Sequence, residues 1–93
     1  MPKVYEFLTK ERWTTIVAAR NKTGMPVRVG HPDAVTFCFL GALEKCYPKS
    51  EIIGLQNKIR EELTQRGEPI SIGRFNDTHG YEAVVELAKQ LDI

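Results

Sequence analysis

The ten residues Ala34–Leu43 contain no charged side chain, and Thr36 is the only one among them with a hydroxyl group. A helix on a protein surface carries polar side chains along one face, and this segment has no such face. We therefore predict that it forms the central element of the fold, covered on several sides. The preceding His-Pro-Asp at positions 31–33 is typical of a helix start, and Pro48 ends the helix, which places it over about residues 32–47.

Two details of this segment concern its packing and its conformation. Gly41 is followed by Ala42, so a neighbouring part of the chain can approach this side of the helix closely. Taken alone, Val35–Leu40 also has the composition of a buried strand. Its continuation into residues 44–46 favours a helix instead.

Apolar residues at helical spacing predict three further helices. The first is short and lies within residues 3–10. The second begins near Ser50, a favourable N-cap residue, and stops at Gly67. The last runs over about residues 81–91. Between these two, residues 69–80 are expected to form an extended piece and then a turn that leads into the last helix.

The stretch between the first helix and the central one has a different composition. Residues 13–17 are rich in β-branched and aromatic side chains, which favour a strand. Residues 21–24 are a turn signal, and residues 25–29 can return alongside the first strand. We predict a small β-hairpin over residues 13–29. The alternative is a single helix over residues 3–20.

Together these elements predict one α+β domain that is mainly helical, with three to four helices around the central apolar helix and one small hairpin. Residues 1–93 are expected to form a single globular domain, because no linker, repeat or low-complexity stretch divides them. Hydrophobic residues make up 42% of the chain and charged residues 27%. These values are those of an ordinary globular protein and argue against disorder.

The charge and cysteine content limit the class of partner and the compartment. The formal net charge is only +1, from 13 basic and 12 acidic residues, whereas duplex-binding domains usually show a clear basic excess. Cys38 and Cys46 are eight residues apart in one predicted helix, too far for a disulfide, so we expect free thiols and a reducing compartment. No signal peptide or membrane span is apparent, so the expectation is a cytoplasmic protein with no membrane partner.

Several short motifs along most of the chain have a characteristic order and spacing. They are Trp13, Ala18 or Ala19, Gly24 with Val27, Asp33-Ala34, Phe37-Cys38-Phe39-Leu40-Gly41-Ala42-Leu43 and Phe75-Asn76-Asp77. In this arrangement the chain resembles a family of small bacterial and phage proteins of unknown function, which share an aromatic-Cys-x-x-Gly-Ala-Leu helix and a late Asn-Asp turn. Relative to that pattern the first helix is short, and the late turn lacks a proline. The resemblance implies a fold and no activity.

Cys38 is the sharpest candidate for chemistry. It lies near the start of the predicted central helix, where the helix dipole can lower the pKa of a thiol. His79 is the candidate base, oriented by Asp77 or Asn76, as in Cys-His-Asn/Asp nucleophilic sites. His31 is an alternative base. The structural alternative is that Cys38 is a small buried hydrophobic residue between two phenylalanines.

A second candidate is the polar stretch Asn76–His79, at the predicted N-terminus of the last helix. Asn76, Asp77 and His79 there would hold an anion or a partner's carboxylate. The structural alternative is that Asp77 or Thr78 only caps that helix. The spacing of the cysteines and histidines does not match a metal site, and no cofactor is expected.

A third candidate is the basic cluster around the predicted turn. Arg20, Lys22 and Arg28 lie close together in the sequence. With Trp13 and Tyr5 nearby, they would form a weak surface for nucleic acid or for an acidic partner. The alternative is a solvated loop.

These observations favour a non-enzymatic module that acts by binding another protein, such as a bacterial or phage-encoded regulator or inhibitor. The chain is short and has no strong catalytic constellation, metal spacing or charge excess. A small thiol-dependent enzyme using Cys38 and His79 is the first alternative, and a nucleic-acid-binding protein is the second. Self-association into a homo-oligomer is a further expectation, because a small domain gains stability by covering apolar surface.

Overall fold

The computed structural model describes residues 2–93, in which five α-helices, one 3-10 helix and two short strands are found. In chain order they are α1 (Val4–Phe7), η1 (Lys10–Arg12), β1 (Ala19–Arg20), β2 (Thr36–Phe37), α2 (Phe39–Cys46), α3 (Lys49–Gln65), α4 (Ile72–His79) and α5 (Tyr81–Leu91). The expected α+β, mainly helical class is confirmed.

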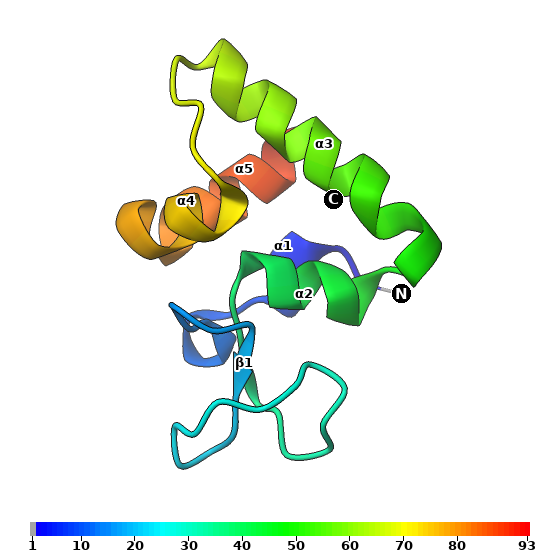
Figure 1. Ribbon diagram of the computed structural model, residues 1–93, viewed down its shortest axis with the longest axis vertical. Coiled ribbons are helices and arrows are strands. Elements are labelled where there is room, and N and C mark those ends of the chain that lie inside the picture. Colours follow the sequence, from blue (N-terminus) through cyan, green and yellow to red (C-terminus); the bar gives the residue numbers. More distant parts are fainter. Residues whose placement is uncertain (1) are drawn as a thin grey trace.

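The helices pack around one another, while the two strands and their loops lie at one end (Figure 1). α1 packs on α2 and α5, α4 packs on α5 and α2, and the long helix α3 contacts α2, α4 and α5. We call residues 14–36 the loop lobe; they contain β1, the first residue of β2 and the long connection between them. In Figure 1 the loop lobe is the blue-to-green lower end of the molecule.

The hydrophobic core draws on every α-helix and on both strands. In α5, Val84, Leu87 and Ala88 are all fully buried, as expected for apolar residues three and four positions apart. The larger apolar side chains of the core come from all parts of the chain: Val4, Leu8, Phe37, Phe39, Leu43, Ile59, Leu63, Ile72, Phe75, Val84, Leu87 and Ile93.

The prediction of one helix over residues 32–47 is wrong in its first part. α2 begins only at Phe39, and Thr36–Phe37 is strand β2. The backbone on either side of this strand is bonded to the loop lobe: the Val35 N–H donates to the Arg20 carbonyl at 2.9 Å, and the Cys38 N–H to the Ala18 carbonyl at 3.1 Å. The segment is largely apolar because β2, in which Phe37 is buried, is followed almost directly by the largely buried helix α2. The His-Pro-Asp sequence forms a turn instead of a helix start.

The turn at Asn21–Gly24 is confirmed, but most of the predicted hairpin is not. Gly24 has a φ of +89°, and the Gly24 N–H donates to the Asn21 carbonyl at 3.0 Å. The antiparallel pair joins β1 to β2, with Ala19 opposite Phe37, whereas pairing inside residues 13–29 is limited to one bridge between residues 20 and 26. The alternative helix over residues 3–20 is also wrong, since α1 ends at residue 7.

The second half of the chain departs from prediction around residues 69–80. Ser71 caps a helix that the sequence reading missed, with its hydroxyl oxygen accepting the Arg74 N–H at 3.1 Å. The predicted turn is therefore α4, and Asp77 lies inside it instead of capping α5. Gly80, with a φ of +91°, separates α4 from α5. Helix α3 starts one residue before the expected Ser50 cap and, as predicted, ends before Gly67.

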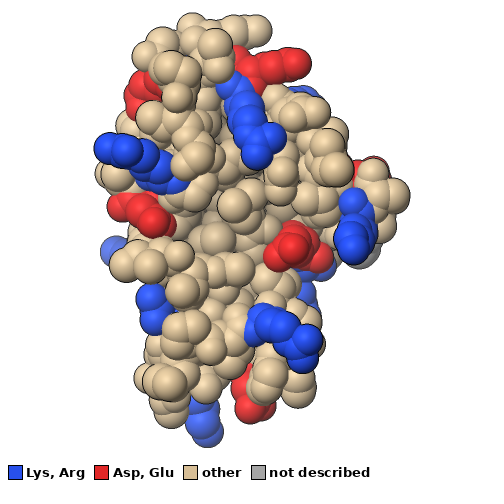
Figure 2. Space-filling view, viewed as in Figure 1, with Lys and Arg blue, Asp and Glu red and all other residues tan. Residues whose placement is uncertain are grey.

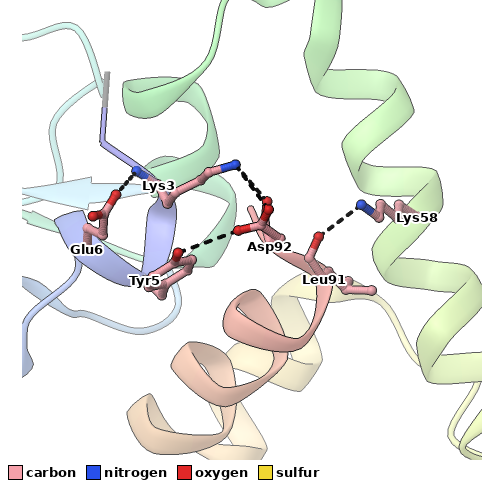
Figure 3. A network of polar contacts seen from close by, with 6 residues as sticks. All are labelled: Lys3, Tyr5, Glu6, Lys58, Leu91 and Asp92. Carbon is pink, nitrogen blue, oxygen red and sulfur yellow. Dashed lines mark hydrogen bonds and ion pairs between the residues drawn. The ribbon is translucent and has the colours of Figure 1, made fainter.

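The two ends of the described chain are joined to each other and to α3 (Figure 3). The Lys3 ammonium donates to the Asp92 carbonyl at 3.0 Å and lies 3.6 Å from its carboxylate. The Val4 N–H donates to the carbonyl of Ile93, whose side chain is buried. From α3, the Lys58 ammonium donates to the Leu91 carbonyl at 2.9 Å. These contacts hold α1, α3 and α5 in one arrangement.

Candidate functional site

Asn76 is the one polar side chain that is fully buried in the described structure. Its Oδ1 accepts the indole N–H of Trp13 at 2.8 Å and the backbone N–H of Phe39 at 3.0 Å. Its Nδ2 donates to the Thr14 carbonyl at 3.1 Å and to Asp77 Oδ1 at 3.0 Å. All the donors and acceptors of the amide are therefore in use, and Asn76 links α4 to the loop lobe and to the start of α2.

Asp77 extends this network to the surface. Its Oδ1 also accepts the backbone N–H of Ile16 at 3.0 Å. Ile16 has a φ of +75°, a conformation that is costly for a β-branched residue and is kept only when the surrounding structure imposes it. Its side chain is 79% exposed. Asp77 therefore helps to hold an apolar side chain out in solvent.

The two cysteines are free and buried. Cys38 is the N-cap of α2, and its Sγ accepts the Gly41 N–H at 3.4 Å. Desolvation by burial raises the pKa of the Cys38 thiol and outweighs the lowering by the backbone N–H groups of Gly41 and Leu40; the negative charge of Asp77 makes a smaller raising contribution. Burial likewise raises the pKa of Cys46 to about 11. The helix start was expected to lower the pKa of the Cys38 thiol, but the loss of water around the thiol raises that pKa by more.

The alternative catalytic grouping of Cys38 with a histidine is not assembled. His79 Nε2 lies 2.6 Å from a carboxylate oxygen of Glu68, and its ring stacks on Phe75 with centroids 4.6 Å apart. His31 lies in the loop lobe, where its Nδ1 accepts the Asp33 N–H. Within residues 2–93, no hydrogen bond joins Cys38 to either histidine. The polar stretch Asn76–His79 is divided as well, with Asn76 in the core and the other three residues exposed on α4.

The three basic candidates have different surroundings. The Arg20 guanidinium donates to the Gly24 carbonyl at 2.8 Å, to the Thr14 hydroxyl at 3.0 Å and to the Thr15 carbonyl at 3.3 Å. These bonds make Arg20 a structural residue that fixes the loop lobe. Lys22 and Arg28 are exposed, and neither side chain has a hydrogen bond or ion pair within the described part of the chain.

The loop lobe also exposes apolar side chains. Met25 is 62% exposed and Val35 is 44% exposed, in addition to Ile16. A surface hollow of about 410 Å³ is lined by residues of the turn and of the segment before β2: Asn21, Lys22, Thr23, Pro32, Asp33 and Val35. In the lower part of Figure 2, where the loop lobe lies, Lys and Arg side chains are more prominent than Asp and Glu.

The role of Asn76 and of its partners Trp13 and Thr14 was not predicted from the sequence. A usable signal was present, since Ile72, Phe75 and Asn76 recur at the three- and four-residue spacing of a buried helix face. It was missed because α4 was interpreted as a turn. The strained position of Ile16 has no sequence signal, since glycine, asparagine and aspartate are the residues that usually mark a positive φ.

Both thiols are expected to resist alkylation in the folded protein. For Cys46, the change of pKa from 9.0 to about 11 alone reduces the thiolate fraction about a hundredfold at neutral pH. We expect iodoacetamide to label Cys46 at least about a hundredfold more slowly in buffer than in denaturing urea. Cys38, whose pKa is also raised by burial, should likewise be labelled more slowly in buffer. Mass spectrometry of tryptic peptides is the readout. Fast labelling of Cys38 in buffer would contradict its assignment to the core and revive a thiol-dependent reaction.

Within residues 2–93, no group of three or more His, Cys, Asp or Glu residues is placed to hold a metal ion. In the same part of the chain, no helix has both the length and the apolar character needed to cross a membrane. No protein-family model matches the chain, and neither the curated proteins nor the solved structures include one with significant similarity to it.

Proposed function

We propose that this chain is a non-enzymatic interaction module that binds another protein through the loop lobe, and that the partner presents an acidic surface with apolar side chains. The observation that carries the proposal is the contrast between the two parts of the molecule. The candidate nucleophile Cys38 and the candidate orienting residue Asn76 are enclosed and engaged in structural contacts. The loop lobe instead exposes three apolar side chains (Ile16, Met25 and Val35) and two basic ones (Lys22 and Arg28).

The charge of the loop lobe supports an acidic partner. Residues 14–36 contain three basic side chains and one acidic side chain, so the loop lobe has a formal charge of +2. The rest of the chain contains the remaining 10 basic and 11 acidic residues, a formal charge of −1. Complementary charge of this kind speeds encounter and selects among partners, while exposed apolar side chains supply the area that becomes buried.

Side-chain hydrogen bonds to the backbone also fix the conformation of the loop lobe. Arg20, Asn21 and Asp77 each bond to backbone groups within it. A surface that is fixed before binding loses less conformational entropy on association, which favours recognition. A bacterial or phage-encoded regulator or inhibitor is the form of this proposal that we favour.

A charge-reversal capture experiment tests the proposal. The immobilised protein is exposed to a lysate of its source organism, and wild type is compared with Lys22→Glu/Arg28→Glu. The matched control is Arg74→Glu/Lys89→Glu, which makes the same change of net charge at exposed residues of α4 and α5.

The expected result is a partner that wild type and the control retain and the loop-lobe variant loses, with affinity lowered at least about tenfold by the reversed charges. The retained protein should elute as salt is raised, because the attraction between exposed charges is screened. Equal retention by both variants, or no retained protein, would count against the loop lobe as a binding surface.

A further inference from the structure

The first half of α3 is poorly covered by the rest of the chain. Of its 17 residues, only Ile59 and Leu63 are buried, and both lie in the second half. In the first half, Ile53 is 71% exposed and Ile52 is half-buried. Two neighbouring isoleucines on an outer helix therefore present apolar surface that the single chain does not cover.

A surface hollow lies directly beside these isoleucines, at the corner where α2 leads into α3. Its volume is about 430 Å³, and it is lined by Glu44, Tyr47, Lys49, Ile52 and Ile53. In Figure 1 this corner projects at the right of the molecule, near the N-terminus and away from the loop lobe. We call these five residues the corner patch. It has an apolar centre and one charge of each sign.

The two charged side chains of the corner patch, Glu44 and Lys49, are not stabilised by contacts within their own chain. Within residues 2–93, neither Glu44 nor Lys49 has a side-chain hydrogen bond or an ion pair. Glu44 lies in the last turn of α2, where the helix dipole favours a cation. Lys49 is the first residue of α3, where the dipole favours an anion. Each charge is therefore at the unfavourable end of its own helix.

We propose that the corner patch is an interface between two copies of this chain related by a two-fold axis. Ile53 of each copy enters the hollow of the other, and Glu44 of each copy pairs with Lys49 of the other. A two-fold interface brings the same patch of both subunits together, so it requires a patch that is complementary to itself. An exposed side chain beside a hollow, with opposite charges at its edge, meets that requirement.

The charges of Glu44 and Lys49 favour a second copy of this chain as the partner that binds the corner patch. A strongly acidic or basic partner would meet one matching and one opposing charge in this patch, whereas a two-fold copy satisfies both at once. The patch is small, so the dimer is a weak one that forms at high protein concentration. It shares no residue with the loop lobe, so this inference and the proposed function are tested separately.

Sedimentation equilibrium from low micromolar to near-millimolar concentration tests the proposal. Wild type is expected to change from monomer to dimer across this range, and Ile53→Glu is expected to weaken association at least about tenfold. Met25→Glu is the matched control, an equally drastic change at an exposed apolar residue of the loop lobe, and it should dimerise as wild type does. A wild type that is monomeric throughout, or an Ile53→Glu variant that dimerises equally well, overturns the proposal.

A charge exchange makes the test specific for the two-fold arrangement. Glu44→Lys and Lys49→Glu are each expected to be monomeric alone, because like charges then meet across the interface. Mixed in equal amounts they should form a heterodimer, since both cross-pairs become attractive again. Both substitutions suit their own helix dipoles, so the monomers should melt no lower than wild type. Single variants that dimerise, or a mixture that does not associate, overturn the arrangement.

Discussion

Replacing Asn76 with leucine is expected to lower the free energy of unfolding by about 3–5 kcal/mol. Leucine has a similar volume but cannot accept the indole N–H of Trp13 or the backbone N–H of Phe39. A buried donor left without a partner costs about 1–3 kcal/mol, and here two donors lose their acceptor together. Urea denaturation followed by tryptophan fluorescence measures the loss and reports on Trp13, the only tryptophan of the chain.

Asn57→Leu is the matched control for this prediction. Asn57 is exposed on α3, and its side chain makes one long contact of 3.4 Å with Arg60. Its replacement should change stability by no more than about 0.5 kcal/mol. If Asn76→Leu were as mild as the control, the amide could not be the group that joins α4 to the loop lobe.

Replacing Gly41 with alanine is expected to destabilise the protein by about 2 kcal/mol or more, even though alanine is the better helix former. A Cβ at this position would lie 2.1 Å from the backbone oxygen of Ala18. That oxygen cannot easily move away, because it accepts the Cys38 N–H that leads the chain into α2. The gain of about 1 kcal/mol in helix propensity is therefore outweighed by displacement of backbone.

The same substitution at another glycine, Gly54→Ala, is expected to change the stability in the opposite direction. Gly54 lies in the middle of α3, and a Cβ there would meet nothing within 4 Å. Only the propensity gain remains, so this variant should be more stable than wild type by about 0.5–1 kcal/mol. Thermal unfolding followed by circular dichroism compares the two variants. A Gly41→Ala variant that melts with or above Gly54→Ala would refute the close approach of Ala18 to α2.

The helices were predictable where a clear apolar stripe met a clear stop signal. The helices α3 and α5, the end of α3 before Gly67 and the short helix α1 were correctly predicted. α4 was missed because it has only 8 residues, too few for its periodicity to stand out against a composition typical of turns. The same error hid Asn76, which is polar in type but lies on the buried face of that helix.

The surroundings of Cys38, His79 and Arg20 could not be predicted for a related reason. Residue type and position in the sequence indicated Cys38, His79 and Arg20 as chemically useful groups. Whether a thiol is activated or suppressed depends on the water and charge around it, and that environment comes from segments far away in the sequence. Arg20 similarly became structural because the loop lobe folds around its guanidinium.

The sequence by itself indicated that the segment Ala34–Leu43 contributes to the core, because removing its apolar side chains from water is favourable. The structure buries Phe37, Phe39, Ala42 and Leu43, whereas Val35 remains 44% exposed. The tertiary structure alone decided that this segment is a strand followed by a helix. Residues 36–37 pair with β1 instead of forming helical hydrogen bonds. Helix α2 begins directly after Cys38, where the Ala18 carbonyl accepts the Cys38 N–H and Asn76 Oδ1 accepts the Phe39 N–H. Hydrophobicity specifies burial, but the choice between strand and helix depends on which distant backbone groups are within reach.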